Sequence, residues 1–403
     1  MPVESTQDLV LTPMAPMHCM RFAKSSPPRQ VLLPNGTPIW LVSRHADVRQ
    51  ALTDRRLTRS LLCAPDAPRT LDVPNILQNP NDVGNLDGAA HRRIRQMMNF
   101  AFTPRAIEQW RPWVAAIVES LLDDLENSRP PVDIVMALTE PLPLAITGRL
   151  MGLEDVDQAR IRQWSDYAIS TTAYPADDVR QAMTEFYAFA MALVADRESN
   201  PGDDLISKLV RAAEDVPEIT EEQVASLVVG LVVAGQAATT VALSNALVYL
   251  LIDRRESWRR LGEADEVAAR GAVDQLLRAI PLSDMTSIPG MLRRAAEPVD
   301  IGGVTIQAGD VVAAHQGIAN HDPDVYPDPD ALDIFAPLTT PHLTFGAGQH
   351  HCPGSWLARM GAELVLHRLA QRFPTMRSGV ALDALRWSEG LNLRSPVALP
   401  VEW

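Results

Sequence analysis

The sequence predicts a mainly α-helical protein with a smaller β-rich portion. Helical periodicity dominates from residue 44 to about residue 278. Within that region, residues 223–252 carry no charge, which predicts one long central helix. After Pro281 the pattern changes to short apolar runs separated by turns, as in VDIGGVTIQAGDVVAA, and this pattern is typical of hairpins. No linker-like composition interrupts the chain, so we expect a single domain spanning residues 1–403.

The expected elements begin with two short strands within residues 31–42, on either side of an Asn35-Gly36 turn. Pro104 suits the first position of a helix, and Thr220 and Gln223 have the spacing of a capping box. Residues 320–340 are rich in proline and aspartate and are expected to be mostly irregular. Helices are expected at residues 87–101, 105–127, 203–213, 220–252 and 267–280, and from Gly354 to about residue 372.

The composition limits which kinds of molecule the protein can bind and in which cellular compartment it is expected. The net charge is −14, from 36 basic and 50 acidic residues, which argues against nucleic acid as a partner. The start, MPVESTQDLV, lacks the basic and apolar regions of a secretory signal, and three scattered cysteines form no disulfide framework. Polar residues interrupt the uncharged run and acids flank it, so a buried helix explains it better than a membrane span. We expect a cytoplasmic monomer that does not bind membranes.

The strongest chemical signal is FGAGQHHCPG at residues 345–354. Its glycines let the backbone lie against a large planar group, where side chains would collide. Cys352 stands at the start of the last helix, where unpaired N–H groups and the helix dipole favour a thiolate. A thiolate is a ligand of haem iron that favours O–O cleavage. A zinc site using His350 and His351 is the alternative, but zinc needs four ligands and no second ligand cluster follows.

This loop resembles the haem-binding loop of cytochromes P450. Five further segments are similar to segments of soluble bacterial members: WLVSRHADVRQAL, DGAAHRRIRQ, GDDLISKLV, ANHDP and LAR. The resemblance implies the cytochrome P450 fold, with haem b (iron protoporphyrin IX) between the central helix and the cysteine loop. It makes Cys352 the axial ligand of the iron. Ala234 and Gly235 of the central helix would also contact the cofactor. The loop residues that match the family pattern are Phe345, Gly346, Gly348, His350, Cys352 and Gly354.

The two haem propionates require cations. His91 and Arg95 lie four residues apart, so a helix presents both on one face. The resemblance implies that both reach the propionates, as do Arg293 and His350. The alternative for the segment HRRIRQ is an ordinary solvated basic face.

The central helix departs from the family pattern. Members usually have Ala-Gly, any residue, an acid and two threonines, of which the acid and first threonine deliver protons. Here Ala237 and Ala238 take those two places, and Thr239 stands about 100° around the helix from the usual donor. A positioned donor is worth roughly 10²–10⁴-fold in rate, so a substitute is expected. Gln236 or Thr239 could hold a water chain, the substrate could supply its own hydroxyl, or peroxide could replace dioxygen; we favour the substrate-assisted route.

A second departure is QLLR at residues 275–278, where the family has Glu-x-x-Arg paired with a further arginine. That arginine would fall near Ala336, so the acid and its partner are lost together. Removing one partner of a buried pair costs about 3–5 kcal/mol, whereas replacing both can be nearly neutral. We therefore expect the fold to survive.

The resemblance implies an enzyme that takes electrons from a ferredoxin and its reductase and oxidises a small molecule or short peptide with O₂. Hydroxylation or epoxidation of a natural-product intermediate is one outcome, and aryl or phenol coupling on a short peptide is the other. Two alternatives remain open: a degenerate haem-binding module that recruits partners, motivated by the alanines at 237 and 238, and a peroxide-driven variant.

Overall fold

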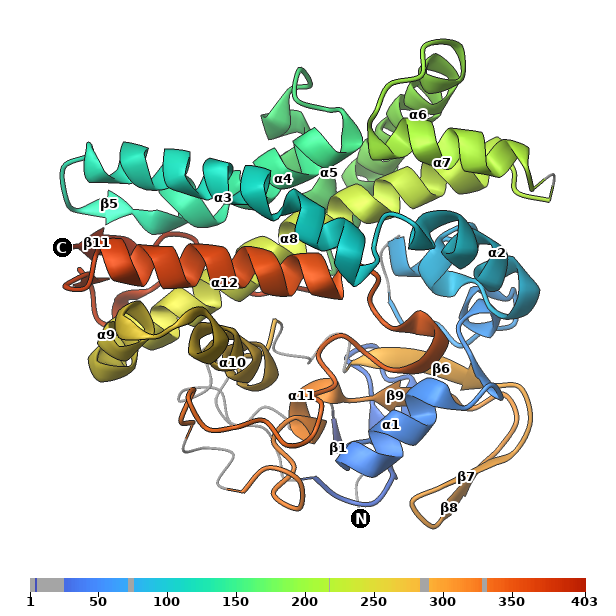
Figure 1. Ribbon diagram of the computed structural model, residues 1–403. Coiled ribbons are helices and arrows are strands. Elements are labelled where there is room, and N and C mark those ends of the chain that lie inside the picture. The colour runs from blue at the N-terminus through green and yellow to red at the C-terminus, as the bar shows by residue number, and fades with distance from the viewer. Residues whose placement is uncertain (1–3, 6–24, 72–75, 217, 283–289, 328–331) are drawn as a thin grey trace.

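The computed structural model describes residues 4–5, 25–71, 76–216, 218–282, 290–327 and 332–403 (Figure 1). Helices make up most of this part of the chain, as the sequence predicts. They are α1 His45–Thr53, α2 Gly88–Asn99, α3 Pro104–Glu126, α4 Pro141–Met151, α5 Gln158–Ala168, α6 Ala176–Ser199, α7 Leu205–Glu214, α8 Glu221–Asp253, α9 Arg255–Glu263, α10 Glu266–Ala279, α11 Gln316–Ala319 and α12 Ser355–Arg372.

The strands form a mixed six-stranded sheet with the order β1-β2-β3-β9-β6-β4 and two smaller sheets, β10-β11-β5 and β7-β8. In the large sheet, β9 pairs parallel with β3 and antiparallel with β6, which joins the start of the chain to its last third. The strands are β1 Glu4–Ser5, β2 Arg29–Leu32, β3 Pro38–Val42, β4 Leu57–Thr58, β5 Val132–Asp133, β6 Met291–Ala295, β7 Val299–Ile301, β8 Val304–Ile306, β9 Val311–Ala314, β10 Arg377–Ser378 and β11 Pro400–Glu402.

The long helix α8 organises the helical part. Thr220 caps it, and Gln223 completes the predicted capping box by bonding back to the Thr220 backbone. By length and composition α8 could cross a membrane, but 61% of its most apolar window is buried, with α4, α5 and α6 packed against it. A core helix of a folded domain accounts for that burial, in agreement with the sequence interpretation.

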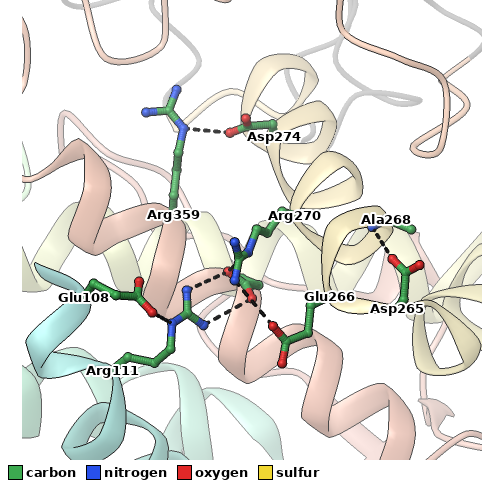
Figure 2. Close-up of polar contacts among 9 residues, drawn as sticks. Glu108, Arg111, Asp265, Glu266, Ala268, Arg270, Asp274 and Arg359 are labelled. Atoms are coloured by element: carbon green, nitrogen blue, oxygen red, sulfur yellow. Dashed lines mark hydrogen bonds and ion pairs between the residues drawn. The ribbon is translucent and has the colours of Figure 1, made fainter. Parts of the chain in front are cut away.

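The helix α12 lies against α3, α8, α9 and α10, and Figure 1 shows it crossing in front of α8. Glu363, only 4% exposed, binds this group together from its place on α12. Its two oxygens accept hydrogen bonds from Arg111 of α3 and Arg270 of α10, whose side chains converge in Figure 2. The segment that precedes α12 is therefore attached to a rigid helix.

The elements predicted from the sequence are present, with ends that differ by a few residues. The hairpin β7-β8 turns at Gly302 and Gly303, both with the positive φ that favours glycine. Residues 320–327 and 332–340 contain no helix or strand, as predicted, and residues 328–331 lie outside the described residues. The pairing of β3 with β9 was not predicted, because periodicity carries no information on which distant strands meet.

Candidate active site

The predicted cysteine loop, residues 345–354, is held in a defined conformation. The Cys352 N–H donates to the Phe345 carbonyl over 2.8 Å, which closes the loop on itself. Gly346 and Gly348 have φ of 73° and 72°, values that side chains disfavour. A Cβ on Gly348 would lie 3.0 Å from the Leu52 carbonyl oxygen, so this glycine also lets the loop approach α1. The glycines are thus required by the backbone of the loop itself.

The Cys352 side chain lies just before α12, in a residue that is partly exposed. Burial raises the pKa of its thiol, although N–H groups of Gly354 and Ser355 and the charges of Arg95 and Arg359 act in the opposite direction. The sequence interpretation expected the start of the helix to favour a thiolate. In the protein alone burial outweighs that effect, so a bound cation such as iron is what would stabilise the thiolate.

The four predicted propionate ligands come together on one side of the loop, although α2, β6 and the loop itself supply them. The rings of His91 and His350 lie 4.3 Å apart between centroids. Burial, and then the charges of His350, Arg95 and Arg293, lower the pKa of His91 to about 4. Arg293 is 1% exposed, and burial followed by the charge of Arg59 lowers its pKa to about 9. We call His91, Arg95, Arg293 and His350 the cation cluster.

This cluster contains buried polar atoms that lack partners within the described part of the chain: Nδ1 of His91 and Nη2 of Arg293. Orphaned buried donors are rare because each costs about 1–3 kcal/mol, more when charged. Two carboxylates placed between these side chains would satisfy both donors. The residues present therefore fit the propionates of a haem.

One further residue near the cluster, Asp87, was not identified from the sequence. Asp87 accepts from the backbone N–H groups of Arg59 and Ser60, and its Oδ1 lies 3.1 Å from Nε2 of His350. Burial opposes ionisation, but the hydrogen bonds from His350 and these N–H groups together lower the pKa of Asp87 to about 2. The sequence interpretation gave Asp87 only a turn with Gly88. No periodic pattern marks a side chain that bonds across 263 residues.

The predicted relay residues of α8 face different directions. The residues Gly230, Ala234 and Ala238, spaced one turn apart, are partly or fully exposed along one face, which we call the exposed stripe. Thr239 is also partly exposed beside it. Ala237, in contrast, is 7% exposed and belongs to the core formed with α5 and α6. The family's acid position is therefore buried here, and its threonine position presents a methyl group.

Gly235 and Gln236, which follow Ala234 on α8, differ in their exposure. Gln236 is 4% exposed and lines a small cavity with Thr147 of α4 and Gln158 of α5. Since it lies about 200° around the helix from Ala234, it points away from the exposed stripe. Gly235 is exposed, but a Cβ on it would lie 3.1 Å from Oγ1 of Thr147, so its lack of a side chain also lets α4 approach α8. The geometry does not support Gln236 as a ligand of water above the cofactor.

The polar side chains of the altered QLLR segment donate hydrogen bonds to uncharged groups. Nε2 of Gln275 donates to the Ala336 carbonyl over 2.9 Å, so the residue expected in the place of the lost partner does lie beside Gln275. Nε of Arg278 donates to Gln275, and its Nη1 donates to the Asn320 carbonyl. Next to them, Asp274 binds Arg359 over 2.7 Å (Figure 2), and the Arg359 guanidinium stacks over the Phe345 ring at 4.5 Å. An ion pair thus links α10 to α12, and its arginine packs on the cysteine loop.

A cavity of about 220 Å³ opens beside the loop. Thr344, adjacent to the loop, lines it together with Arg59, Pro281, Met291 and Asn392. Its described lining includes neither Cys352 nor any residue of α8. This cavity therefore lies to one side of the Cys352 sulfur, towards the sheet.

The comparisons with known proteins agree with this geometry. A family model described as Cytochrome P450 matches residues 156–383. Mycinamicin IV hydroxylase/epoxidase of Micromonospora griseorubida is 37% identical over 94% of this chain and 93% of its own. Nocardicin C N-oxygenase of Nocardia uniformis subsp. tsuyamanensis is 36% identical over 94% and 92%. The crystal structure of a cytochrome P450 with biaryl coupling reactivity is 34% identical, with a TM-score of 0.86 over 94% of this chain and 93% of that one.

The chain belongs to the cytochrome P450 family. It is therefore a monooxygenase-type oxidoreductase with a haem cofactor, related to enzymes of antibiotic and secondary-metabolite biosynthesis. Within the described residues, no group of three or more His, Cys, Asp or Glu side chains is placed to hold a metal ion. Cys352 and the cation cluster would hold the haem, which would supply the oxidation chemistry, while the chain would position the substrate and shield it from solvent.

Proposed function

We propose that this enzyme oxidises a natural-product intermediate that carries a hydroxyl, phenol or carboxylate group, and that this group takes the place of the missing proton donor. Haem b is the cofactor, with Cys352 as axial ligand, and a ferredoxin and its reductase supply the electrons. The chain acts as a single cytoplasmic domain and as a monomer. Hydroxylation or epoxidation is the first candidate reaction, in keeping with the name of the mycinamicin relative.

The observation that carries this proposal is the exposed stripe of α8. At Ala234 and Ala238 it has only methyl groups, and Ala237 is in the core. Beside the stripe, α8 carries the partly exposed Thr239, which has a hydroxyl. Small side chains leave room for a polar group of the substrate next to the reacting oxygen, and a proton donor at that point is worth roughly 10²–10⁴-fold.

Aryl or phenol coupling is the second candidate, because the structural relative with biaryl coupling reactivity covers almost the whole chain. Coupling removes two hydrogens and inserts no oxygen. Mass spectrometry of the product separates the two reactions, since hydroxylation adds one oxygen atom and coupling removes two hydrogens.

The test begins with a ferric absorbance titration of the holoenzyme against natural products that carry a hydroxyl group. The ligand that gives product is then compared with its O-methyl analogue. We expect the analogue to lose roughly 10²–10⁴-fold in product formed per electron pair consumed. In the Ala238→Thr variant the analogue should regain most of that loss, whereas Ala242→Thr, one turn further along, should not.

Equal turnover of both ligands by the unaltered enzyme would contradict the substrate-assisted route. Turnover supported by peroxide and not by ferredoxin would favour the peroxide-driven alternative. A haem-loaded protein that consumes neither reduced cofactor nor peroxide with any ligand would favour a recruitment module.

A further inference from the structure

A carboxyl group lies against the central helix at a place where that helix has no side chain. Asp82 precedes a short helical turn, and its Oδ1 accepts the Gly84 N–H over 2.8 Å. The other oxygen, Oδ2, faces Gly230 of α8 at 2.9 Å from the position that a Cβ would take. A larger residue at 230 would collide with this oxygen. The cap therefore uses one oxygen of Asp82 and leaves the second beside α8.

This second oxygen lies at the start of the exposed stripe. Gly230 is one turn before Ala234, which places Asp82 about 6 Å along the helix axis from the residue expected over the cofactor. Both Asp82 and Gly230 are partly exposed, while the neighbouring residues Val228 and Val229 are buried. A ligand that extends along the stripe from Ala238 would meet the carboxyl group.

The charge of Asp82 is poorly compensated. Three titratable groups face it: Arg59, Cys63 and Tyr187. Arg59 already donates to the Gly84 carbonyl, Asn85 and the Leu292 carbonyl, and no salt bridge involves Asp82 in the part of the chain that the structure describes. Burial raises the pKa of Asp82 to about 6, against the hydrogen bond from Gly84 and the attraction of Arg59. The group is still mostly ionised at neutral pH, at a cost that a cation would relieve.

The remaining polar groups nearby are satisfied among themselves. Nδ2 of Asn79 contacts the Tyr187 hydroxyl at 2.5 Å and Ser226 Oγ at 3.2 Å. The Asn85 amide donates to the Asn79 carbonyl over 2.8 Å. These contacts brace the loop that carries Asp82 against α6 and α8. The carboxyl group is thus held in place by groups that do not neutralise it.

We propose that Asp82 determines substrate specificity, and that its Oδ2 receives a positively charged amine of the substrate. This inference rests on the proposed function, since it assigns the substrate class of the same site. A cation gains the attraction of a partly buried carboxylate, a neutral donor gains only one hydrogen bond, and an anion is repelled. The amine would lie about one helical turn from Ala234, so the oxidised carbon and the cation stand at opposite ends of the bound part of the substrate.

The test uses three ligands with one apolar body: 1-adamantyltrimethylammonium, 1-adamantanemethanol and 1-adamantanecarboxylate. The quaternary ammonium cannot ligate iron, so binding to the haem-loaded enzyme can be measured by calorimetry without that complication. At about pH 7.5 we expect the cation to bind about 10-fold tighter than the alcohol and about 100-fold tighter than the carboxylate. Lowering the pH to about 5 should weaken the cation about 10-fold, because Asp82 becomes protonated, and leave the alcohol unchanged.

Two variants test the residue itself. Asp82→Asn keeps an acceptor for the Gly84 N–H and removes the charge, so the preference for the cation should fall to within about 2-fold. Gly230→Ala adds a Cβ at 2.9 Å from Oδ2 and should displace the carboxyl group, with the same direction of effect. Asp157→Asn is the matched control, because Asp157 also caps a helix with its side chain but does so at α5. It should leave all three affinities unchanged.

Equal affinities for cation and alcohol, a preference that survives in Asp82→Asn, or no binding of the cation would each overturn the inference. The reduced, carbon monoxide-treated enzyme separates this failure from failure of the proposed function. If it shows the absorption band of sulfur-ligated haem and yet no preference for the cation, only the specificity inference fails. If the band is missing, the proposed function fails first.

Discussion

The two sides of the cofactor site are formed by different types of residue. On the side of the cysteine loop, charged side chains hold the backbone: Asp274 binds Arg359, Glu363 binds Arg111 and Arg270, and Asp87 meets His350. On the side of α8, the residues at the family's proton-delivery positions are alanines. One is packed in the core and the other presents a methyl group.

This difference between the two sides shows that the residues expected to bind the cofactor are distinct from those expected to deliver protons. Binding of a haem by Cys352 and the cation cluster would use a thiolate, cations for the propionates and a loop of fixed shape, and none of these depends on the substrate. Proton delivery depends on what is bound above the iron, so a substrate that brings its own donor relaxes the demand on α8. The predictions below test the loop side first, where the expected effects are largest.

The largest effect is expected from the sulfur. Cys352→Ser removes the thiolate, and an alcohol is a far weaker donor to iron. The absorption band of the reduced, carbon monoxide-treated protein should shift away from that of sulfur-ligated haem, and monooxygenase turnover should disappear. Cys63→Ser is the control, since Cys63 lies outside the loop and should leave the spectrum unchanged. An unchanged spectrum in Cys352→Ser would contradict the ligand assignment.

The next effect concerns the helix that carries the loop. In Glu363→Gln, Arg111 and Arg270 lose a shared carboxylate that is buried while the arginines are partly exposed. Breaking a buried pair costs about 3–5 kcal/mol, and solvent around the arginines reduces this to about 1–3 kcal/mol. Urea unfolding of the haem-free protein measures it. Glu256→Gln removes an exposed pair with Arg259 and should cost less than about 0.5 kcal/mol.

A smaller, pH-dependent effect is expected at Asp87. Because the folded protein lowers the pKa of this carboxyl from 3.8 to about 2, its ionised form stabilises the fold above about pH 4, and that contribution is lost as the pH falls towards 2. Asp87→Asn should therefore reduce the free energy of unfolding by roughly 2 kcal/mol at neutral pH. Denaturation at a series of pH values should show the two proteins converging as the medium becomes acidic. A difference that stays constant with pH would point to lost packing instead.

The same contrast explains which features could be predicted from the sequence. Capping at Thr220, the turn glycines and the cysteine loop are local, so their residue order and spacing identify them. Ala336, expected in the place of the lost arginine, does accept a hydrogen bond from Gln275. Apart from that contact, which spans 61 residues, these features require only that neighbouring residues adopt a known backbone.

Features that depend on long-range packing, and that the family resemblance does not supply, could not be predicted. Asp87 is adjacent to Gly88 in sequence, yet its carboxylate reaches His350, and Asp82 meets Gly230 only because two loops and α8 converge. The surroundings of the Gln236 side chain depend on the positions of α4 and α5, and the sequence does not predict those positions. A polar residue beside a motif is readily assigned to the chemistry. Whether it can take part depends on the direction in which its side chain points from the helix.

The smallest effect is expected on the α8 side, at Gln236. Its Oε1 is buried without a hydrogen-bond partner among the described residues, and its side chain points towards Thr147 and Gln158. Gln236→Leu replaces an unsatisfied polar group by an apolar one of similar size, so stability should stay the same or rise by up to about 1 kcal/mol. Turnover should change less than about 2-fold, because this side chain does not face the substrate.

A large loss of turnover in Gln236→Leu would indicate that the protein, and not the substrate, delivers the proton. If Gln236→Leu slows product formation by about 10-fold or more while the ligand affinity holds, a water next to Gln236 takes part in the relay. The solvent deuterium isotope effect on turnover would then differ between the variant and the unaltered enzyme. Gln275→Leu cannot serve as its control, since Gln275 holds Ala336 and Arg278; Gln181→Leu, on the exposed face of α6, can. The contrast between the two sides of the cofactor holds only if Gln236→Leu behaves like Gln181→Leu.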